Sequence, residues 1–427
     1  MITTALGLLL LLLALSIPVG IGMGLLGLIL NVLYSPLPLT VMLGELTWSS
    51  TNSFILVAVP FYIFLGEIVL RSGIAERMYA ALVQWVSWLP GGLMHSNVAA
   101  CSMFAAISGS SVATAVTIGT VALDEVKRHK YNERLFLGTL AAGGTLGILI
   151  PPSINMVVYG VMTETSIPKL YLAGFIPGFT LAALFSLTVL IACWWRPQWS
   201  GEPVRTSWAA RLRGLPDLVP PLLIFLVVIG SIYAGFATAT ESAALGILAA
   251  LALAAIRRRL TWTMLKQAFE GTIRTTSAVM LIILGAYFLN VVINAIGLIA
   301  VITSFVTSLN LTPTQLLVAV IAFYLILGCF METLSMMVAT VPIVTPLMVK
   351  AGFDPVWFGI LIVIHMETAM VTPPVGINLF VVQGVRGRGQ LHDVILGTAP
   401  FVVALILMIT IICVFPGLVL WLPRLAG

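Results

Sequence analysis

Two stretches of the sequence decide the fold: residues 143–160 read GGTLGILIPPSINMVVYG, and residues 372–384 read TPPVGINLFVVQG. Each has a double proline inside an apolar run, with an asparagine shortly after it: Asn155 in the first stretch and Asn378 in the second. Proline lacks a backbone N–H and clashes with the preceding helical turn, so each stretch predicts a helix that is broken in its middle. Two matching breaks predict a chain made of two repeats.

The composition predicts that both breaks lie in a membrane. Hydrophobic residues make up 60% of the 427 residues and charged residues 8%, whereas soluble domains contain about 25% charged residues. We therefore expect one all-α polytopic membrane domain over residues 1–427. The chain has no phosphate-binding GxxxxGK[ST] motif, and its four cysteines and four histidines are too scattered for a metal site. We expect no enzyme activity, no organic cofactor and no nucleic-acid partner.

Nine apolar stretches are long enough to cross the bilayer, which takes about 20 residues. We expect these crossings at about 4–33 (bent at Pro18), 53–70, 132–162, 168–195, 216–236, 241–256, 276–294, 356–384 and 391–422. Regions 93–126 and 314–350 differ, because each consists of two apolar halves around a polar tip. Halves of about 15 residues reach about 22 Å, which is short of the roughly 30 Å hydrocarbon core. Each region predicts a re-entrant helical hairpin, and segments 74–88 and 298–309 predict helices in the membrane plane.

The two halves match along their length. Pro151 pairs with Pro373, Asn155 with Asn378, and other pairs keep an offset between 222 and 225. We expect a first repeat over 1–195 (hairpin 93–126, broken helix 132–162), a linking helix at 216–236, and a second repeat over 241–427 (hairpin 314–350, broken helix 356–384). Nine crossings and two hairpins place the lysine and arginine clusters on one side, the cytoplasm, with the N-terminus inside and the C-terminus outside. The repeats are then inverted, which is typical of secondary transporters.

The polar tips and breaks predict ion chemistry. The first hairpin tip, residues 107–111, reads ISGSS, and the second, residues 331–335, reads METLS. Hydroxyls, freed carbonyls and one asparagine amide form a neutral oxygen shell that suits Na⁺, while helix N-termini suit an anionic substrate. We expect two sodium sites around one substrate site, with Na⁺ the only metal. Glu332 and Glu367 are possible coupling acids; Glu241 fits a helix start, and Glu67 fits an ion pair with Arg71.

Further stretches show a resemblance to a known family. Residues 59–75 read VPFYIFLGEIVLRSGIA, residues 104–122 read FAAISGSSVATAVTIGTVA, and residues 237–246 read ATATESAALG. Together with the two proline stretches, they resemble the large (DctM-like) membrane subunit of the tripartite ATP-independent periplasmic (TRAP) transporters over nearly the whole chain. The chain departs from the family at Thr114, where an acid is frequent, and at Ala239, where proline is common.

The resemblance implies Na⁺-driven import of an organic acid, such as a C4-dicarboxylate or sialic acid, across the bacterial inner membrane by an elevator mechanism. It also implies a periplasmic substrate-binding protein and a small four-helix membrane subunit as partners. By position, the cation ligands would be Ser108, Ser110, Ser111, Gly147 and Asn155 in one half and Thr333, Thr372, Gly376 and Asn378 in the other. The substrate would lie between the tips, at Ser110, Ser111, Ser153, Thr333, Ser335 and Thr372.

Three other functions stay open on the residues alone. A carrier with the same inverted hairpins could work without partner proteins, and uptake by this chain alone would favour it. An intramembrane hydrolase would need an activated nucleophile, but no His or Lys stands near the serine-rich tip. A passive channel is disfavoured by two occluding hairpins and by the lack of a continuous polar helix face, and a unitary current without substrate would support it.

Overall fold

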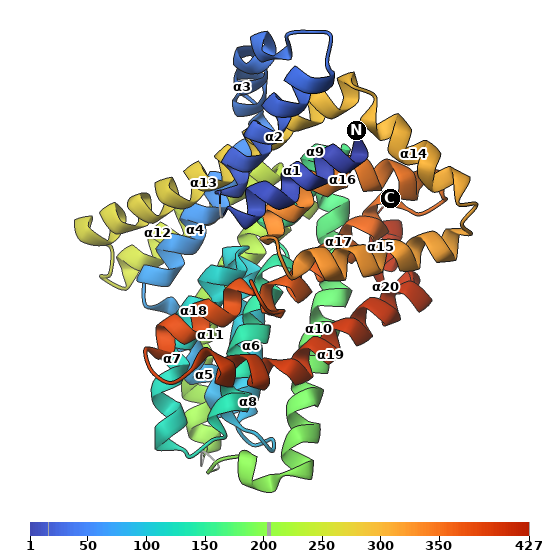
Figure 1. Cartoon of the computed structure of the whole chain (residues 1–427). Helices are drawn as coiled ribbons and strands as arrows, with labels where there is room; N and C mark the ends of the chain where they lie inside the picture. The colour runs from blue at the N-terminus through green and yellow to red at the C-terminus, as the bar shows by residue number, and fades with distance from the viewer. Residues whose placement is uncertain (16, 203–205, 427) are drawn as a thin grey trace.

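The computed structural model describes residues 1–15, 17–202 and 206–426 (Figure 1). Over these ranges the chain folds into twenty α-helices and four short 3₁₀ helices, without a strand. Seven of the helices are long and apolar enough to cross a membrane. The predicted all-α membrane fold is confirmed.

The helices of the first half follow one another through short connections. Their bounds are α1 (Ile2–Ala14), α2 (Val19–Tyr34), α3 (Leu43–Thr51), α4 (Ala58–Arg71), α5 (Ile74–Val86), α6 (Leu93–Ser108), α7 (Ser111–Arg128), α8 (Glu133–Thr145), α9 (Ile154–Thr163) and α10 (Ile167–Trp195). The 3₁₀ helices are η1 (Leu39–Met42), η2 (Phe54–Val57), η3 (Leu146–Ile148) and η4 (Pro197–Trp199).

The second half has the same number of α-helices. Their bounds are α11 (Trp208–Tyr233), α12 (Ala239–Ile256), α13 (Trp262–Ala295), α14 (Leu298–Ser308), α15 (Pro313–Gly328), α16 (Thr333–Lys350), α17 (Pro355–Val371), α18 (Ile377–Arg386), α19 (Leu391–Val414) and α20 (Gly417–Leu425). The predicted in-plane segments correspond to α5 and α14.

The N-terminal segment differs from the prediction of one bent crossing over 4–33. Its two helices, α1 and α2, fold back on one another, so that the hydroxyls of Thr4 and Tyr34 lie 2.7 Å apart. The reversal occurs next to Pro18, which stands at the N-cap of α2 and has no N–H to continue a helix. The predicted single crossing is wrong, because both of its ends lie at the same end of the molecule.

Three other bounds correct the sequence prediction. Helix α11 begins at Trp208 rather than 216, and α13 begins at Trp262 rather than 276. In each case a hydroxyl of the preceding residue, Ser207 or Thr261, accepts a hydrogen bond from a first-turn N–H and starts the helix early. The last predicted crossing, 391–422, is instead two helices, with Pro416 at the N-cap of α20.

Both predicted hairpins are present. Helices α6 and α7 reverse direction at Gly109, whose φ of 61° lies in the left-handed region that glycine adopts most readily. Helices α15 and α16 reverse over residues 329–332. Because each hairpin folds back at its tip, it carries polar groups into the protein interior without crossing it.

Both predicted breaks are present as well. In the first, α8 passes through η3 and the Pro151–Pro152 pair before α9 begins. In the second, α17 ends at Val371 and α18 begins only after the Pro373–Pro374 pair. The half-helices that precede the breaks form the centre of the core, since every residue of α17 from Val356 onward is buried.

The half-helices that follow the breaks pack on the opposite half of the chain. Helix α9 lies against α16 and α17, whereas α18 lies against α7 and α8. Each broken helix therefore begins in one half and ends against the other. The division of the chain into repeats at 1–195 and 241–427 stays a prediction.

Candidate functional site

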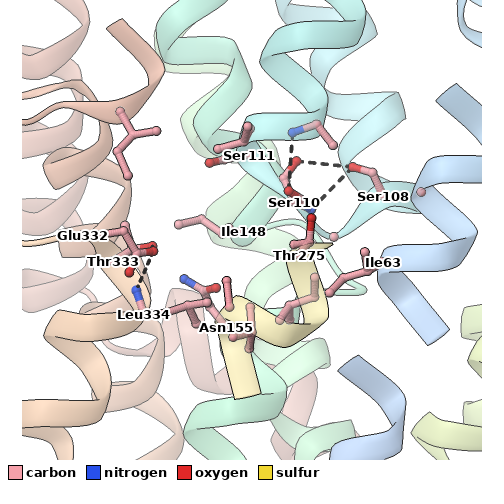
Figure 2. Close-up of a pocket in the computed structure, with 18 of the residues that line it drawn as sticks. Ile63, Ser108, Ser110, Ser111, Ile148, Asn155, Thr275, Glu332, Thr333 and Leu334 are labelled. Carbon is pink, nitrogen blue, oxygen red and sulfur yellow. Dashed lines mark hydrogen bonds between the residues drawn. The ribbon is translucent and has the colours of Figure 1, made fainter. Parts of the chain in front are cut away.

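One cavity of about 590 Å³ lies where the two hairpin tips meet. Figure 2 shows Ser108, Ser110 and Ser111 on one side and Glu332 and Thr333 on the other. Its remaining walls come from α4, α9 and α13, with single residues of α2, η3, α17 and α18. A cavity of this size can hold a small organic molecule.

The first hairpin tip gathers three oxygen atoms. The hydroxyl of Thr114 donates to the carbonyl of Ser110 at 2.7 Å and lies 3.1 Å from the hydroxyl of Ser108. Gly147, at the first break, comes so close that an added Cβ would lie 2.5 Å from the Ser110 carbonyl oxygen and 2.8 Å from the Thr114 hydroxyl. The hairpin tip and the break therefore share one oxygen-rich spot that only glycine fits.

The second hairpin tip is organised by its own carboxylate. Glu332 caps α16, accepting from the N–H groups of Leu334 and Ser335 at 3.0 Å each. The hydroxyls of Thr333 and Ser335 donate to the same carboxylate at 3.0 and 2.9 Å. Glu332 therefore occupies the anion-binding end of α16 itself, while the matching place on α7 is taken by the neutral Ser110.

Each hairpin tip is tied to the break of its own half by one backbone hydrogen bond. The N–H of Ile154 donates to the carbonyl of Gly109 at 3.4 Å, and the N–H of Val375 donates to the carbonyl of Cys329 at 3.3 Å. Both donors follow a double proline, and both acceptors lie in the turn of a hairpin. The predicted match between the two halves thus extends to the contacts at the breaks.

The two asparagines that follow the breaks are both buried. Asn378 donates from Nδ2 to the carbonyl of Ala141 at 3.1 Å, and its Oδ1 has no partner among the described residues. Asn155 donates from Nδ2 to the sulfur of Met366 at 3.5 Å. A buried amide oxygen without a donor is a ready ligand for a cation.

The cavity collects some of the predicted site residues but not all. The predicted residues on its wall are Ser108, Ser110, Ser111, Asn155, Glu332, Thr333 and Ser335. The predicted residues that do not line it are Gly147, Ser153, Thr372, Gly376, Asn378 and Glu367. Two of those outside the cavity are held by local hydrogen bonds: Ser153 donates to the carbonyl of Ile148 at 2.6 Å, and Thr372 donates to that of Thr368 at 2.6 Å.

The acids take different roles. Glu367 is buried in α17, and neither of its carboxyl oxygens has a hydrogen-bond partner among the described residues. Glu241 forms a capping box with Thr238 at the start of α12, as expected of a helix-start acid. Glu67 pairs with Arg71 at 2.7 Å, as predicted, but it also lines the cavity.

Sequence reasoning missed three residues of the site. Thr275 and Glu67 reach the cavity from α13 and α4, and Thr114 completes the oxygen cluster of the first tip. Thr114 could have been found, because it stands one helical turn after Ser110. Thr275 belongs to no motif, so only packing reveals it. Among the described residues that line the cavity there is no Lys, Arg or His.

Comparison with known proteins decides the family. The sequence model of the DctM component of tripartite ATP-independent periplasmic transporters matches residues 6–418. The chain belongs to this family. A C4-dicarboxylate TRAP transporter large permease protein of Vibrio cholerae is 32% identical over 395 residues, covering 87% of this chain and 86% of the relative.

Relatives named for other substrates match almost as well. A sialic acid TRAP transporter large permease protein of Vibrio cholerae is 31% identical, covering 88% of this chain and 87% of the relative. A 2,3-diketo-L-gulonate TRAP transporter large permease protein of Escherichia coli is 29% identical, with 87% of each chain covered. This DctM-family chain is thus a membrane transport protein, and its relatives are named as permeases rather than enzymes.

The fold is also found among solved structures. The crystal structure of the Alcanivorax borkumensis YdaH transporter, described as having an unusual topology, superposes with a TM-score of 0.65 over 96% of this chain and 98% of that one. The two sequences are 14% identical. The likeness therefore shows a shared fold.

Proposed function

We propose that this DctM-family protein is the transport subunit of a secondary active importer that couples Na⁺ entry to uptake of an organic acid. The observation that carries the proposal is the convergence of both hairpin tips and the first broken helix on one cavity. Paired broken helices whose ends face a central site are how secondary transporters bind ions and substrate together.

The sodium sites lie beside the cavity, one in each half. The first draws on Ser108, Ser110, Ser111, Gly147 and Asn155, and the second on Thr333, Thr372, Gly376 and Asn378. The hydroxyl cluster at Ser108 and the free Oδ1 of Asn378 support this placement, since each offers oxygen without positive charge. Glu332 is a helix cap in this scheme, and Glu367 stays a candidate for proton coupling.

The substrate lies in the cavity between Ser110, Ser111, Thr333 and Ser335. Ser153 and Thr372 do not line the cavity, so neither contacts the substrate in this scheme, and Thr372 serves only the second sodium site. Since no basic side chain of the described lining neutralises a carboxylate, the N-terminus of α7, whose cap Ser110 is uncharged, and bound Na⁺ supply the positive potential. A C4-dicarboxylate, sialic acid or a similar acid fits the substrates for which the relatives are named.

Two partner proteins complete the transporter: a small membrane subunit that extends the scaffold and a periplasmic substrate-binding protein that delivers the acid. Transport is elevator-like, with the hairpins and broken helices moving against α4 and α13. The lysine and arginine clusters after α4, α7, α10, α12 and α18 face the cytoplasm of a bacterial inner-membrane protein. With α1 folded back on α2, the N-terminus lies outside with Tyr34, instead of in the cytoplasm.

Uptake into proteoliposomes tests the proposal. The protein, with its partner proteins, is reconstituted and offered a radiolabelled panel of succinate, sialic acid and 2,3-diketo-L-gulonate under an inward Na⁺ or K⁺ gradient. We expect uptake of one acid that needs both the Na⁺ gradient and the binding protein. Uptake by this chain alone would instead support a self-sufficient carrier, and uptake that is equal with K⁺ would contradict sodium coupling.

A further inference from the structure

The two asparagines of the site reach across the boundary between the halves. Asn378, on α18 of the second half, donates to Ala141 on α8 of the first half. Asn155, on α9 of the first half, donates to Met366 on α17 of the second half. Each break thus places its asparagine against the helix that leads into the other break.

The half-helices that follow the breaks also pack against the opposite half of the chain. Helix α18 packs on α7, whose N-terminus is the first hairpin tip, and α9 packs on α16, whose N-terminus is the second tip. Each proposed sodium site is therefore in contact with a half-helix from the other half. This packing gives a shift at one break a route to the other, because closely packed interiors transmit strain.

The fit around Asn378 is tight. An added Cβ at Gly144 would lie 3.1 Å from Nδ2 of Asn378 and 2.7 Å from the Cβ of Ala115. The amide is thus held between α8 and α7, with Nδ2 bonded to Ala141 and Oδ1 left without a partner among the described residues. One end of the side chain is anchored in the first half, while the other end is free to bind a cation.

We propose that Asn378 and Asn155 couple the two sodium sites, so that an ion bound at one break raises the affinity of the other. The inference rests on the proposed function, which supplies the two sites. A cation bound by Oδ1 of Asn378 fixes the start of α18. The hydrogen bond from Nδ2 to Ala141 then also fixes α8, which lies beside the first sodium site. Coupling between binding sites is reciprocal, so an ion at the first break favours the second equally.

The strengths of the two asparagine hydrogen bonds predict which asparagine contributes more to the coupling between the sodium sites. Asn378 donates to a carbonyl, whereas Asn155 donates to a thioether sulfur, which is a weak acceptor. We expect a typical coupling of about 5- to 150-fold in affinity, and we expect most of it to depend on Asn378. The Hill coefficient for Na⁺ then lies above 1 and below the limit of 2 set by two sites.

Direct binding of radiolabelled Na⁺ to the purified full-length protein tests the coupling. Asn378→Asp keeps an oxygen at the ligand position but replaces the Nδ2 donor to Ala141. We expect this variant to bind two ions with a Hill coefficient near 1. Gly144→Ala, which displaces the amide without removing a proposed ligand, should act in the same direction. Gly144→Ala also tests the coupling if Asn378→Asp does not fold.

Gly384→Ala is the matched control, because Gly384 lies on the same helix as Asn378 and an added Cβ there meets no atom within 4 Å. This variant should keep the wild-type Hill coefficient. A wild-type coefficient of 1 with two bound ions, or wild-type cooperativity in both Asn378→Asp and Gly144→Ala, would overturn the coupling and leave the sodium sites standing. Absence of Na⁺ binding to the wild-type protein would overturn the sites themselves.

Discussion

The backbone N–H of Ile154 donates to the carbonyl of Gly109, so the start of α9 is hydrogen-bonded to the turn of the first hairpin. The break before α18 is bonded to the second hairpin in a similar way, from the N–H of Val375 to the carbonyl of Cys329. These bonds fix the hairpin tips and breaks as single units. Substitutions at the tips and breaks are therefore expected to change both how each unit holds its oxygen atoms and how the units are joined.

Gly147→Ala should disrupt the first sodium site. The added Cβ would lie 2.5 Å from the Ser110 carbonyl oxygen and must push the hairpin tip away from the break. We expect the apparent affinity for Na⁺, measured from the thermal stabilisation of the purified protein, to fall at least several-fold. Gly230→Ala is the control, since an added Cβ there meets no atom within 4 Å. An unchanged Na⁺ response in Gly147→Ala would argue against a site at this spot.

Glu332→Ala should destabilise the second hairpin. It leaves the N–H groups of Leu334 and Ser335 without their acceptor, and losing such a cap costs about 1–2 kcal/mol of unfolding free energy. Glu332→Gln keeps one acceptor oxygen and should cost less. Denaturant unfolding of both variants checks the order, and equal stability of the two would show that capping is not the role of this carboxylate.

Arg386 should contribute more to the free energy of unfolding than Arg388 does, although both contact Glu133. The Arg386 side chain is 6% exposed and bridges Glu133 of α8 and Asp393 of α19 at 3.1 and 3.3 Å. The Arg388 side chain is 46% exposed and bonds Glu133 alone. We expect Arg386→Ala to lower the free energy of unfolding more than Arg388→Ala does, because Arg386 is nearly buried and joins two carboxylates.

Arg388→Ala serves as the matched control and should cost less than about 1 kcal/mol. Both values come from unfolding curves in the same detergent. The reverse order would mean that the ends of α8, α18 and α19 are not joined through Arg386.

Gly397→Ala should prevent α8 and α19 from packing. Its Cβ would clash with the backbone carbonyl of Arg134, and that atom cannot move as a side chain can. Helix α8 also carries Gly138 at the same crossing. We expect loss of the folded protein after detergent extraction, measured by size-exclusion chromatography. Gly7→Ala, at a position with no atom within 4 Å of an added Cβ, should leave the yield unchanged.

The breaks and hairpins could be predicted because their causes are local. Proline at 151 and 373 removes helix donors whatever surrounds it. Each hairpin shows in the sequence as two apolar halves around a polar tip, although α16, with 18 residues, is longer than the predicted half and is itself long and apolar enough to cross a membrane. The early starts of α11 and α13 were missed, although Ser207 and Thr261 are typical N-cap residues. That signal was present in the sequence.

Other features depend on packing between distant segments. The fold-back that brings Thr4 to Tyr34 cannot be distinguished in sequence from a bent crossing, because both have proline at the bend. The partner of Asn378 could not be predicted either. The sequence places Asn378 with the second half, whereas in the fold its amide donates to Ala141 of the first half. Thr275 reaches the cavity only because α13 crosses it. A sequence pattern gives the chemistry of a residue but not its partner across the core.

Thermal unfolding of the purified protein in Na⁺ or K⁺, at constant ionic strength, tests the central claim most directly. A ligand that binds only the folded state stabilises it by RT ln(1 + [L]/Kd), and no substrate needs to be known. We expect saturable stabilisation by Na⁺ alone, and we expect Ser110→Ala to weaken it. Equal unfolding temperatures in the two salts would contradict it, because the hairpin tips and breaks would then bind no sodium.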